Sequence, residues 1–82
     1  MNSAQCKAAR ALLGMTQSQL AERANVGLST VVDFERARRH VSDEAIGTIR
    51  SALEKAGIEF IDEKGGGPGV RLRHTENKAS DG

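Results

Sequence analysis

The stretch from Thr16 to Glu35, TQSQLAERANVGLSTVVDFE, constrains the fold more than any other part of the chain, because its local signals predict two short helices joined by a tight turn. Thr16 is followed three residues later by Gln19, a spacing typical of a capping box at a helix N-terminus. Asn25 tolerates the left-handed backbone that often ends a helix, and Gly27 loosens the chain further. The pattern predicts a first helix that begins directly after Thr16 and a second that begins directly after Gly27.

Apolar residues within this stretch keep helical spacing. In the first helix Leu20, Ala21 and Ala24 form one stripe, and in the second Val31 and Phe34 lie one turn apart. The two stripes are expected to pack against each other, which turns the polar side chains of the second helix outward. These outward side chains are Ser29, Thr30 and Asp33. Such a pair can lay one helix in a DNA groove, and it can equally be one part of a helical bundle.

Two further helices are expected around this pair. The first covers Ser3–Leu13 and ends before Gly14. Its apolar side is expected to consist of Cys6, Ala9, Leu12 and Leu13. The last helix begins after Ser42, a good N-cap residue, keeps helical spacing of apolar residues over several turns and ends at Gly57.

The pattern changes after Gly57. Residues Ile58–Ile61 are apolar and β-prone, Glu63–Gly69 is a glycine-rich turn that contains the only proline, and Val70–Arg73 alternates apolar with basic. This predicts a hairpin. Because an isolated hairpin is marginally stable in water, it must pack on the helices or on a second subunit. The polar segment of residues 74–82 is expected to be disordered.

The length and composition fit a small binding module rather than an enzyme. A chain of 82 residues gives one domain with a modest core. It contains no nucleophile elbow and no recurring carboxylate pair, so no catalytic residue is expected. It also has no long apolar run for a membrane span or a secretory signal, which predicts a cytoplasmic location without membrane contact.

Cysteine and histidine usage gives no sign of a metal or cofactor site. The single Cys6 lies on an apolar helix face and is expected to be a small buried residue. His40 and His74 have no Cys or His partner at metal-ligand spacing. The GGGPG run is not followed by the Lys-Ser/Thr pair and helix of a phosphate-binding loop, so it is interpreted as a turn.

The charged residues are unevenly distributed, although the formal net charge is only +1. Residues 1–40 contain six Lys or Arg against three Asp or Glu, a balance of +3, and residues 41–82 contain six against eight, a balance of −2. The helical pair lies in the positive half. This asymmetry favours an anionic partner, although runs of charge are also common on solvated faces.

The run from Lys7 to Val41, with LLGMTQSQLAERANVGLSTVVDFERARR at its centre, resembles the Cro/repressor (Xre-type) helix-turn-helix family of bacterial and phage DNA-binding proteins. With the helix after Ser42 included, the resemblance covers about 50 of the 82 residues. The residues that carry it are Arg10, the Thr16-Gln17 pair, Leu20 and Ala21, Val26, the Ser29-Thr30-Val31 run and Glu35. The resemblance implies a lambda-repressor-like bundle of four or five helices and a dimer that acts as a transcriptional repressor at a near-palindromic operator.

The resemblance also implies roles for individual residues. The side chains expected to read bases from the second helix of the pair are Leu28, Ser29, Thr30, Val32 and Asp33. The residues expected to contact DNA phosphates are Arg10, Thr16, Gln17, Arg36, Arg38, Arg39 and His40. Arg10 and Glu35 are expected to form an ion pair that ties the first helix to the base-reading helix, and a purely structural role for this pair stays open.

Some features depart from the family pattern. Gly27 stands where the family usually has a capping Ser or Thr, which weakens the start of the base-reading helix slightly. Asp33 places a carboxylate toward DNA, where phosphates repel it unless a base donor such as cytosine N4 compensates. The hairpin lies outside the shared family core, so its role depends on this sequence alone.

Three functions compete at this point. In the first, residues 1–57 are a DNA-binding domain, and the chain is a homodimeric transcriptional regulator that binds double-stranded DNA, with the hairpin of residues 58–73 as a dimerisation element. In the second, the chain is an adaptor or antitoxin whose hairpin binds a partner protein by strand addition. The third, RNA binding, is disfavoured because Phe34 and Phe60, the only aromatic residues, are expected in the core rather than on a stacking platform.

Overall fold

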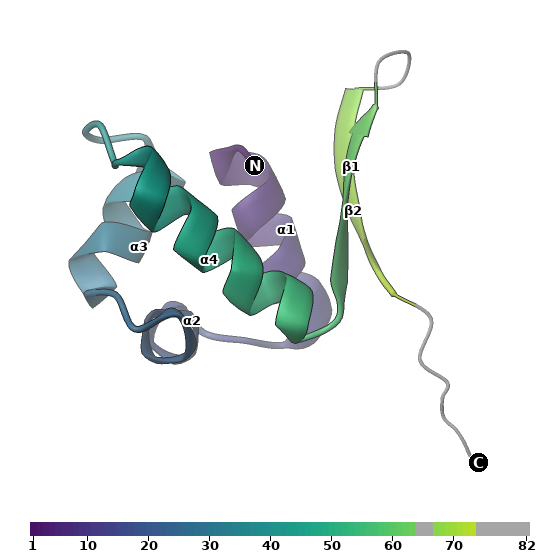
Figure 1. Ribbon diagram of the computed structural model, residues 1–82, viewed down its shortest axis with the longest axis horizontal. Coiled ribbons are helices and arrows are strands. Elements are labelled where there is room, and N and C mark those ends of the chain that lie inside the picture. Colours follow the sequence, from purple (N-terminus) through teal and green to yellow (C-terminus); the bar gives the residue numbers. More distant parts are fainter. Residues whose placement is uncertain (64–66, 74–82) are drawn as a thin grey trace.

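The computed structural model describes residues 1–63 and 67–73 and contains helices followed by a two-stranded antiparallel sheet (Figure 1). The elements are α1 (Ser3–Leu13), α2 (Gln17–Ala24), α3 (Leu28–Arg36), α4 (Asp43–Lys55), β1 (Ile58–Glu63) and β2 (Gly67–Leu72). The predicted fold class, mainly helical with a C-terminal hairpin, is confirmed. The tail of residues 74–82, which was expected to be disordered, lies outside the described residues.

The ends of α2 form as the local sequence predicts. The Thr16 hydroxyl accepts a hydrogen bond from the Gln19 backbone N–H at 3.0 Å, and the Gln19 side chain accepts one from the Thr16 N–H at 2.9 Å. Asn25 then adopts the left-handed conformation, with φ 57°, and ends the helix. The same capping box, which the sequence analysis did not single out, starts α1 between Asn2 and Gln5.

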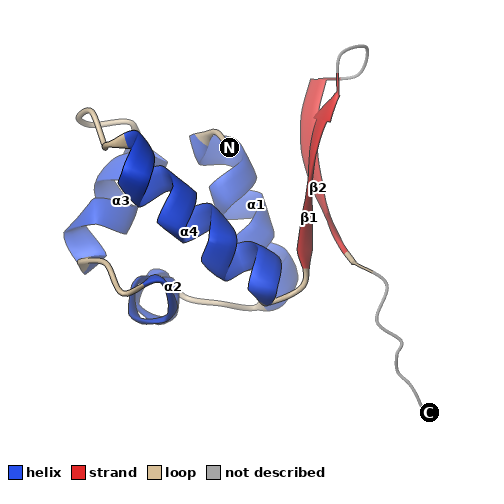
Figure 2. Ribbon diagram, in the orientation of Figure 1, coloured by secondary structure: helices blue, strands red, loops and turns tan. Residues whose placement is uncertain are grey.

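The core lies between the helices and extends to the inner face of the hairpin. Its largest fully buried side chains include Leu20 from α2, Val31 from α3, Ile49 and Leu53 from α4, and Ile58 from β1. Figure 2 shows the hairpin standing along one side of the helices, next to α1 and the end of α4, with α3 on the far side of both. Among the described residues nothing covers the side of α3 that carries Leu28 and Ser29, which are exposed.

The hairpin packs on the helices of its own chain. Ile58 pairs with Leu72 and Phe60 pairs with Val70, so these four side chains share one face of the sheet. Ile58 is fully buried there, and Phe60 and Val70 pack against the helical core. The Arg50 guanidinium from α4 lies 4.8 Å from the Phe60 ring centroid, a cation–π contact that fastens the strand further.

The predicted turn of the hairpin is too long. Strand pairing extends to Glu63 on β1 and resumes at Gly67 on β2, so much of the stretch expected as a turn is strand. The Arg73 backbone N–H donates to the Gly57 carbonyl, and hydrogen-bonded pairs alternate along the ladder, so the odd-numbered residues of β1 form the hydrogen-bonded pairs with β2. Pro68 pairs with an even-numbered residue, and its backbone nitrogen therefore points away from β1. Proline is tolerated there because it removes no bond from the ladder.

The prediction that Leu12 belongs to the buried side of α1 is wrong. Leu12 is 45% exposed, whereas Cys6 and Ala9 are fully buried and Leu13 packs against the core. Leu12 lies four residues after Ala8, which is also exposed and lines a groove between α1 and β2, and the core of so small a protein does not extend around the helix that far.

The two helix ends at Gly14 and Ala37 give a matched test of backbone strain. Both residues are left-handed, with φ 65° and 53°, but alanine pays a steric penalty there that glycine does not. Ala37→Gly is expected to raise the free energy of unfolding by about 0.5–1 kcal/mol. Gly14→Ala is expected to lower it by a similar amount, since a Cβ there meets nothing within 4 Å and only the backbone term changes. Urea denaturation measures both changes in the free energy of unfolding. A destabilised Ala37→Gly variant would contradict the prediction that left-handed alanine is strained at this helix end.

Candidate nucleic-acid interface

The outer face of α3 presents the side chains that were expected to read bases. Leu28, at the start of the helix, is 46% exposed, and Ser29 is exposed beside it. Thr30, Val32 and Asp33 are partly exposed on the same helix. The opposite side of α3 is fixed by burial, because Val31 is fully buried and Phe34 packs against the core.

A depression of about 530 Å³ lies beside α3, where α1 turns into α2. Its lining residues are Lys7, Arg10, Gly14, Met15, Thr16, Gln17, Glu35 and Arg36. Lys7 and Arg36 are both exposed, so two cations stand at the N-terminal end of α2, where backbone N–H groups also favour an anion. Lys7 was not among the residues predicted to contact DNA, although its position one helical turn before Arg10 places it on the same side of α1.

The floor of this depression is a buried polar network around Glu35, which is only 3% exposed. Its carboxylate accepts hydrogen bonds from Nε and Nη2 of Arg10, both at 2.7 Å, from Nε2 of Gln17 at 3.0 Å and from the Cys6 thiol at 3.1 Å. Nη1 of Arg10 donates to the Met15 carbonyl at 3.1 Å. Donors from α1 and α2 therefore converge on one carboxylate of α3 and fix the positions of the three helices relative to one another.

Protonation in this network follows from burial and hydrogen bonding. Burial raises the pKa of Glu35, but the hydrogen bonds from Arg10, Cys6 and Gln17 outweigh it and hold that pKa below its ordinary value. Burial and the adjacent Glu35 carboxylate both raise the pKa of the Cys6 thiol, so Cys6 stays protonated and acts as a donor. Cys6 is thus a buried residue without the exposed, electropositive surroundings of a reactive thiol.

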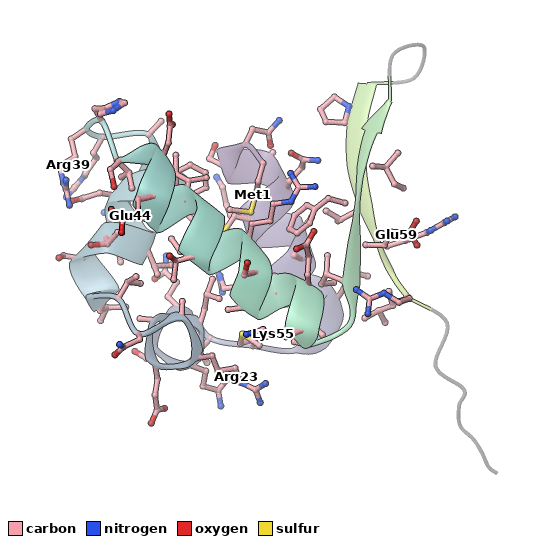
Figure 3. The ribbon with its side chains drawn as sticks, in the orientation of Figure 1. Met1, Arg23, Arg39, Glu44, Lys55 and Glu59 are labelled. Atoms are coloured by element: carbon pink, nitrogen blue, oxygen red, sulfur yellow. The ribbon has the colours of Figure 1, made fainter. Side chains whose placement is uncertain are left out.

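Asp33 has an internal partner that the sequence did not reveal. Its Oδ2 lies 2.6 Å from Nε of Arg39, which folds back from the connection between α3 and α4, and Arg39 Nη1 donates to the His40 carbonyl at 3.4 Å. The Asp33 side chain is 18% exposed and that of Arg39 is 54% exposed. Figure 3 shows Arg39 at the outer edge of the molecule beside α3. The ion pair offsets the negative charge of Asp33 on this face of α3.

Other residues predicted to contact phosphates lie at the end of α3 or follow it in the chain. Arg36, Arg38 and His40 are exposed in the last turn of α3 and the connection after it. Gln17 and Arg10, by contrast, have their side-chain donors engaged by Glu35, and Arg10 is 19% exposed. The structure thus brings the N-terminus of α2 and the end of α3 together beside one depression, while the Arg10 and Gln17 side chains are held at its floor by Glu35.

Two further observations concern the described part of the chain. No helix among its elements is long and apolar enough to cross a membrane. Within residues 1–63 and 67–73, no cluster of three or more His, Cys, Asp or Glu side chains is arranged to hold a metal ion.

Sequence comparison agrees with this geometry. Residues 7–60 match the helix-turn-helix family model, which spans α2, α3 and the elements that support them. No curated protein shows significant similarity to the chain. The matched family consists of regulators that bind double-stranded DNA and are in general not enzymes. The chain therefore belongs to the Cro/repressor (Xre-type), lambda-repressor-like helix-turn-helix family and is a DNA-binding transcription regulator.

Proposed function

We propose that the chain is a repressor that binds a near-palindromic operator as a homodimer, with one α3 in each of two successive major grooves about 34 Å apart. The observation that carries this proposal is the exposed face of α3, together with the exposed Lys7 and Arg36 beside the N-terminus of α2 and the exposed arginines of the connection after α3. Occupation of the operator would block access to an overlapping promoter.

Base reading is proposed for the N-terminal half of α3. Leu28 and Val32 lie four residues apart on the outer face, a spacing that suits contact with thymine methyl groups. The Ser29 hydroxyl can donate to or accept from a base edge, and Thr30 borders the same face. The helix starts at Gly27 without a side-chain cap, which leaves its first N–H groups available to DNA phosphates.

Phosphate contacts are proposed for the basic and polar residues around this face. Arg36, Arg38, Arg39 and His40 would supply contacts that set affinity rather than sequence preference, together with Thr16 and Gln17 at the start of α2. The exposed ammonium of Lys7 is added to this set because it lines the same depression. Arg10 acts mainly by orienting Glu35 and, through Glu35, the Gln17 amide.

Selection of bound duplexes from a random pool tests this proposal. We expect an inverted repeat whose half-site centres are about 10–10.5 base pairs apart, because each α3 enters one major groove of the same DNA face. Enrichment of a single unsymmetrical site would contradict the homodimer. Recovery of no preferred sequence would contradict base reading, and the variant Leu28→Lys serves as a control in which the preference is expected to be lost.

A second candidate function has one structural observation in its favour. Leu72 on β2 is 48% exposed, and the same strand could receive a strand from another protein, as in an adaptor or antitoxin. The two functions are compatible, since β2 and α3 lie at opposite ends of the molecule (Figure 1). They differ in which molecule pairs with the edge of β2, a second copy of this chain or another protein.

A further inference from the structure

We propose that the occupant of β2 is a second copy of this chain: the β2 edges of two subunits pair antiparallel about a two-fold axis at Val70 and join their hairpins into one four-stranded sheet. This inference rests on the proposed homodimer and specifies its surface. It requires that β2 has a free edge, that apolar side chains accompany the edge, and that the strand is complementary to itself.

The free edge follows from the hydrogen-bond pattern of the hairpin. The Arg73 N–H donates to the Gly57 carbonyl across the sheet, and hydrogen-bonded pairs alternate along an antiparallel ladder. The backbone groups of Val70 and Leu72 therefore point away from β1. Pro68 has only a carbonyl on that side, which can still accept a hydrogen bond. An edge with these donors and acceptors is a template for pairing with another strand.

Apolar side chains accompany this edge. Three large hydrophobic side chains of the described residues are exposed to nearly the same extent: Leu12 at 45%, Leu28 at 46% and Leu72 at 48%. Leu28 belongs to the outer face of α3 that is proposed to read bases. The other two lie on α1 and β2, which together form a groove of about 320 Å³. Leu12 lies one helical turn after Ala8, which lines this groove, and Leu72 lies two residues after Val70, on the same face of the strand.

The sequence of β2 suits pairing with itself in one register. With Val70 on the axis, Leu72 of one subunit lies opposite Pro68 of the other on the apolar face, and its N–H can donate to that Pro68 carbonyl. On the outer face Arg71 lies opposite Gly69, which offers no charge and no bulk. Moving the axis to Arg71 would place two arginines directly opposite each other, which is unfavourable. Charge therefore disfavours the register centred on Arg71, and the register centred on Val70 places Leu72 against Pro68 of the partner subunit.

The outer face of the sheet is compatible with this arrangement. Arg71 already forms a two-point hydrogen bond with Glu59 across its own hairpin, at 3.1 Å from both Nε and Nη2. Figure 3 shows Glu59 on the side of the hairpin away from the helices. Pairing through β2 leaves this ion pair intact, and it leaves α3 uncovered because α1 and α4 stand between α3 and the hairpin (Figure 1).

The three similarly exposed leucines provide the test. Sedimentation equilibrium of the full chain is expected to show a dimer whose dissociation constant rises at least tenfold in Leu72→Lys and in Leu12→Lys, because each substitution places charges from both subunits in the apolar contact. Leu28→Lys is the matched control: the dimer is expected to persist while the operator preference is lost. A dimer of unchanged affinity in Leu72→Lys would overturn the inference.

A second pair of variants tests the backbone pairing and separates it from side-chain packing. Leu72→Ala and Leu72→Pro both shorten the side chain, but only the proline removes the N–H that would donate to Pro68 of the partner subunit. The dissociation constant is expected to be at least tenfold higher for the proline variant than for the alanine variant, with unchanged circular dichroism. Equal constants would overturn strand pairing.

The same measurements distinguish this inference from the proposed function. A wild-type dimer that responds to Leu72 as expected but selects no DNA sequence would support the interface and contradict the operator proposal. A chain that stays monomeric at millimolar concentration would overturn the interface whatever it binds. A monomer that copurifies with another protein, and loses it in Leu72→Pro, would overturn self-pairing in favour of the adaptor.

Discussion

Replacing Glu35 by alanine is expected to lower the free energy of unfolding by about 3–5 kcal/mol, the cost typical of removing one partner from a buried ion pair. The loss is large because Arg10, Gln17 and Cys6 all direct donors at this carboxylate, and Arg10 would keep its charge without a partner. A small domain has a total stability of about 5–15 kcal/mol, so the variant is expected to be close to unfolding. Urea denaturation followed by circular dichroism measures the change.

Glu59 provides the matched control for Glu35. It is also a glutamate held by an arginine at two points, through Arg71, but both side chains are solvent-exposed. Exposed ion pairs contribute little because water and salt screen them. Glu59→Gln is therefore expected to leave the denaturation midpoint nearly unchanged. Equal destabilisation by the two substitutions would show that burial is not what makes the Glu35 network important.

The more conservative Glu35→Gln variant adds a pH signature. Although burial alone raises the pKa of Glu35, its hydrogen bonds hold the folded-state pKa below the ordinary value of 4.5. A depressed pKa gives stability that is fully present above the unfolded-state pKa and is lost as the pH falls through the folded-state pKa. The difference in free energy of unfolding between wild type and Glu35→Gln is thus expected to be constant near neutral pH and to shrink below about pH 4.5. An advantage that grew on acidification would contradict this sign.

The helix boundaries were predictable because they depend on residues close in sequence. The Thr16 and Gln19 capping box, the left-handed Asn25 and the glycine at 14 each act within one or two turns of the helix they delimit. The stripes containing Leu20 and Val31 were predictable for the same reason, since helical spacing alone puts their members on one face.

The contacts that the sequence did not reveal join residues that are far apart in the chain or depend on the shape of the whole core. Leu12 has the right spacing for burial but lies beyond the edge of a small core. The bond from the Cys6 thiol to Glu35 spans 29 residues. Arg39 reaches Asp33 only because left-handed Ala37 turns the chain back toward α3. Local pattern carries no information on such pairs.

The last of these pairs predicts the largest effect on DNA binding. Arg39→Ala is expected to weaken operator binding by about tenfold per subunit and about a hundredfold for the dimer, because it removes a phosphate contact and leaves the Asp33 carboxylate uncompensated beside DNA. Losing one phosphate contact from each subunit should also reduce the slope of log affinity against log salt by about 1.8. Fluorescence anisotropy with the selected operator, repeated over a salt series, measures both quantities.

Asp33→Asn decides between two roles for this carboxylate. If Asp33 mainly positions Arg39 and is neutralised by it, the Asp33→Asn variant alone should bind DNA at least as tightly as wild type. Combined with Arg39→Ala, the same substitution should restore about tenfold of the lost affinity, because the repulsion between the carboxylate and the phosphates is gone. If Asp33 instead accepts from cytosine N4, the single variant should lose affinity and relax the preference at one base pair of each half-site while leaving the salt slope unchanged. The 2.6 Å contact with Arg39 favours the first outcome, because a carboxylate oxygen engaged at that distance would have to give up its guanidinium before it could read a base.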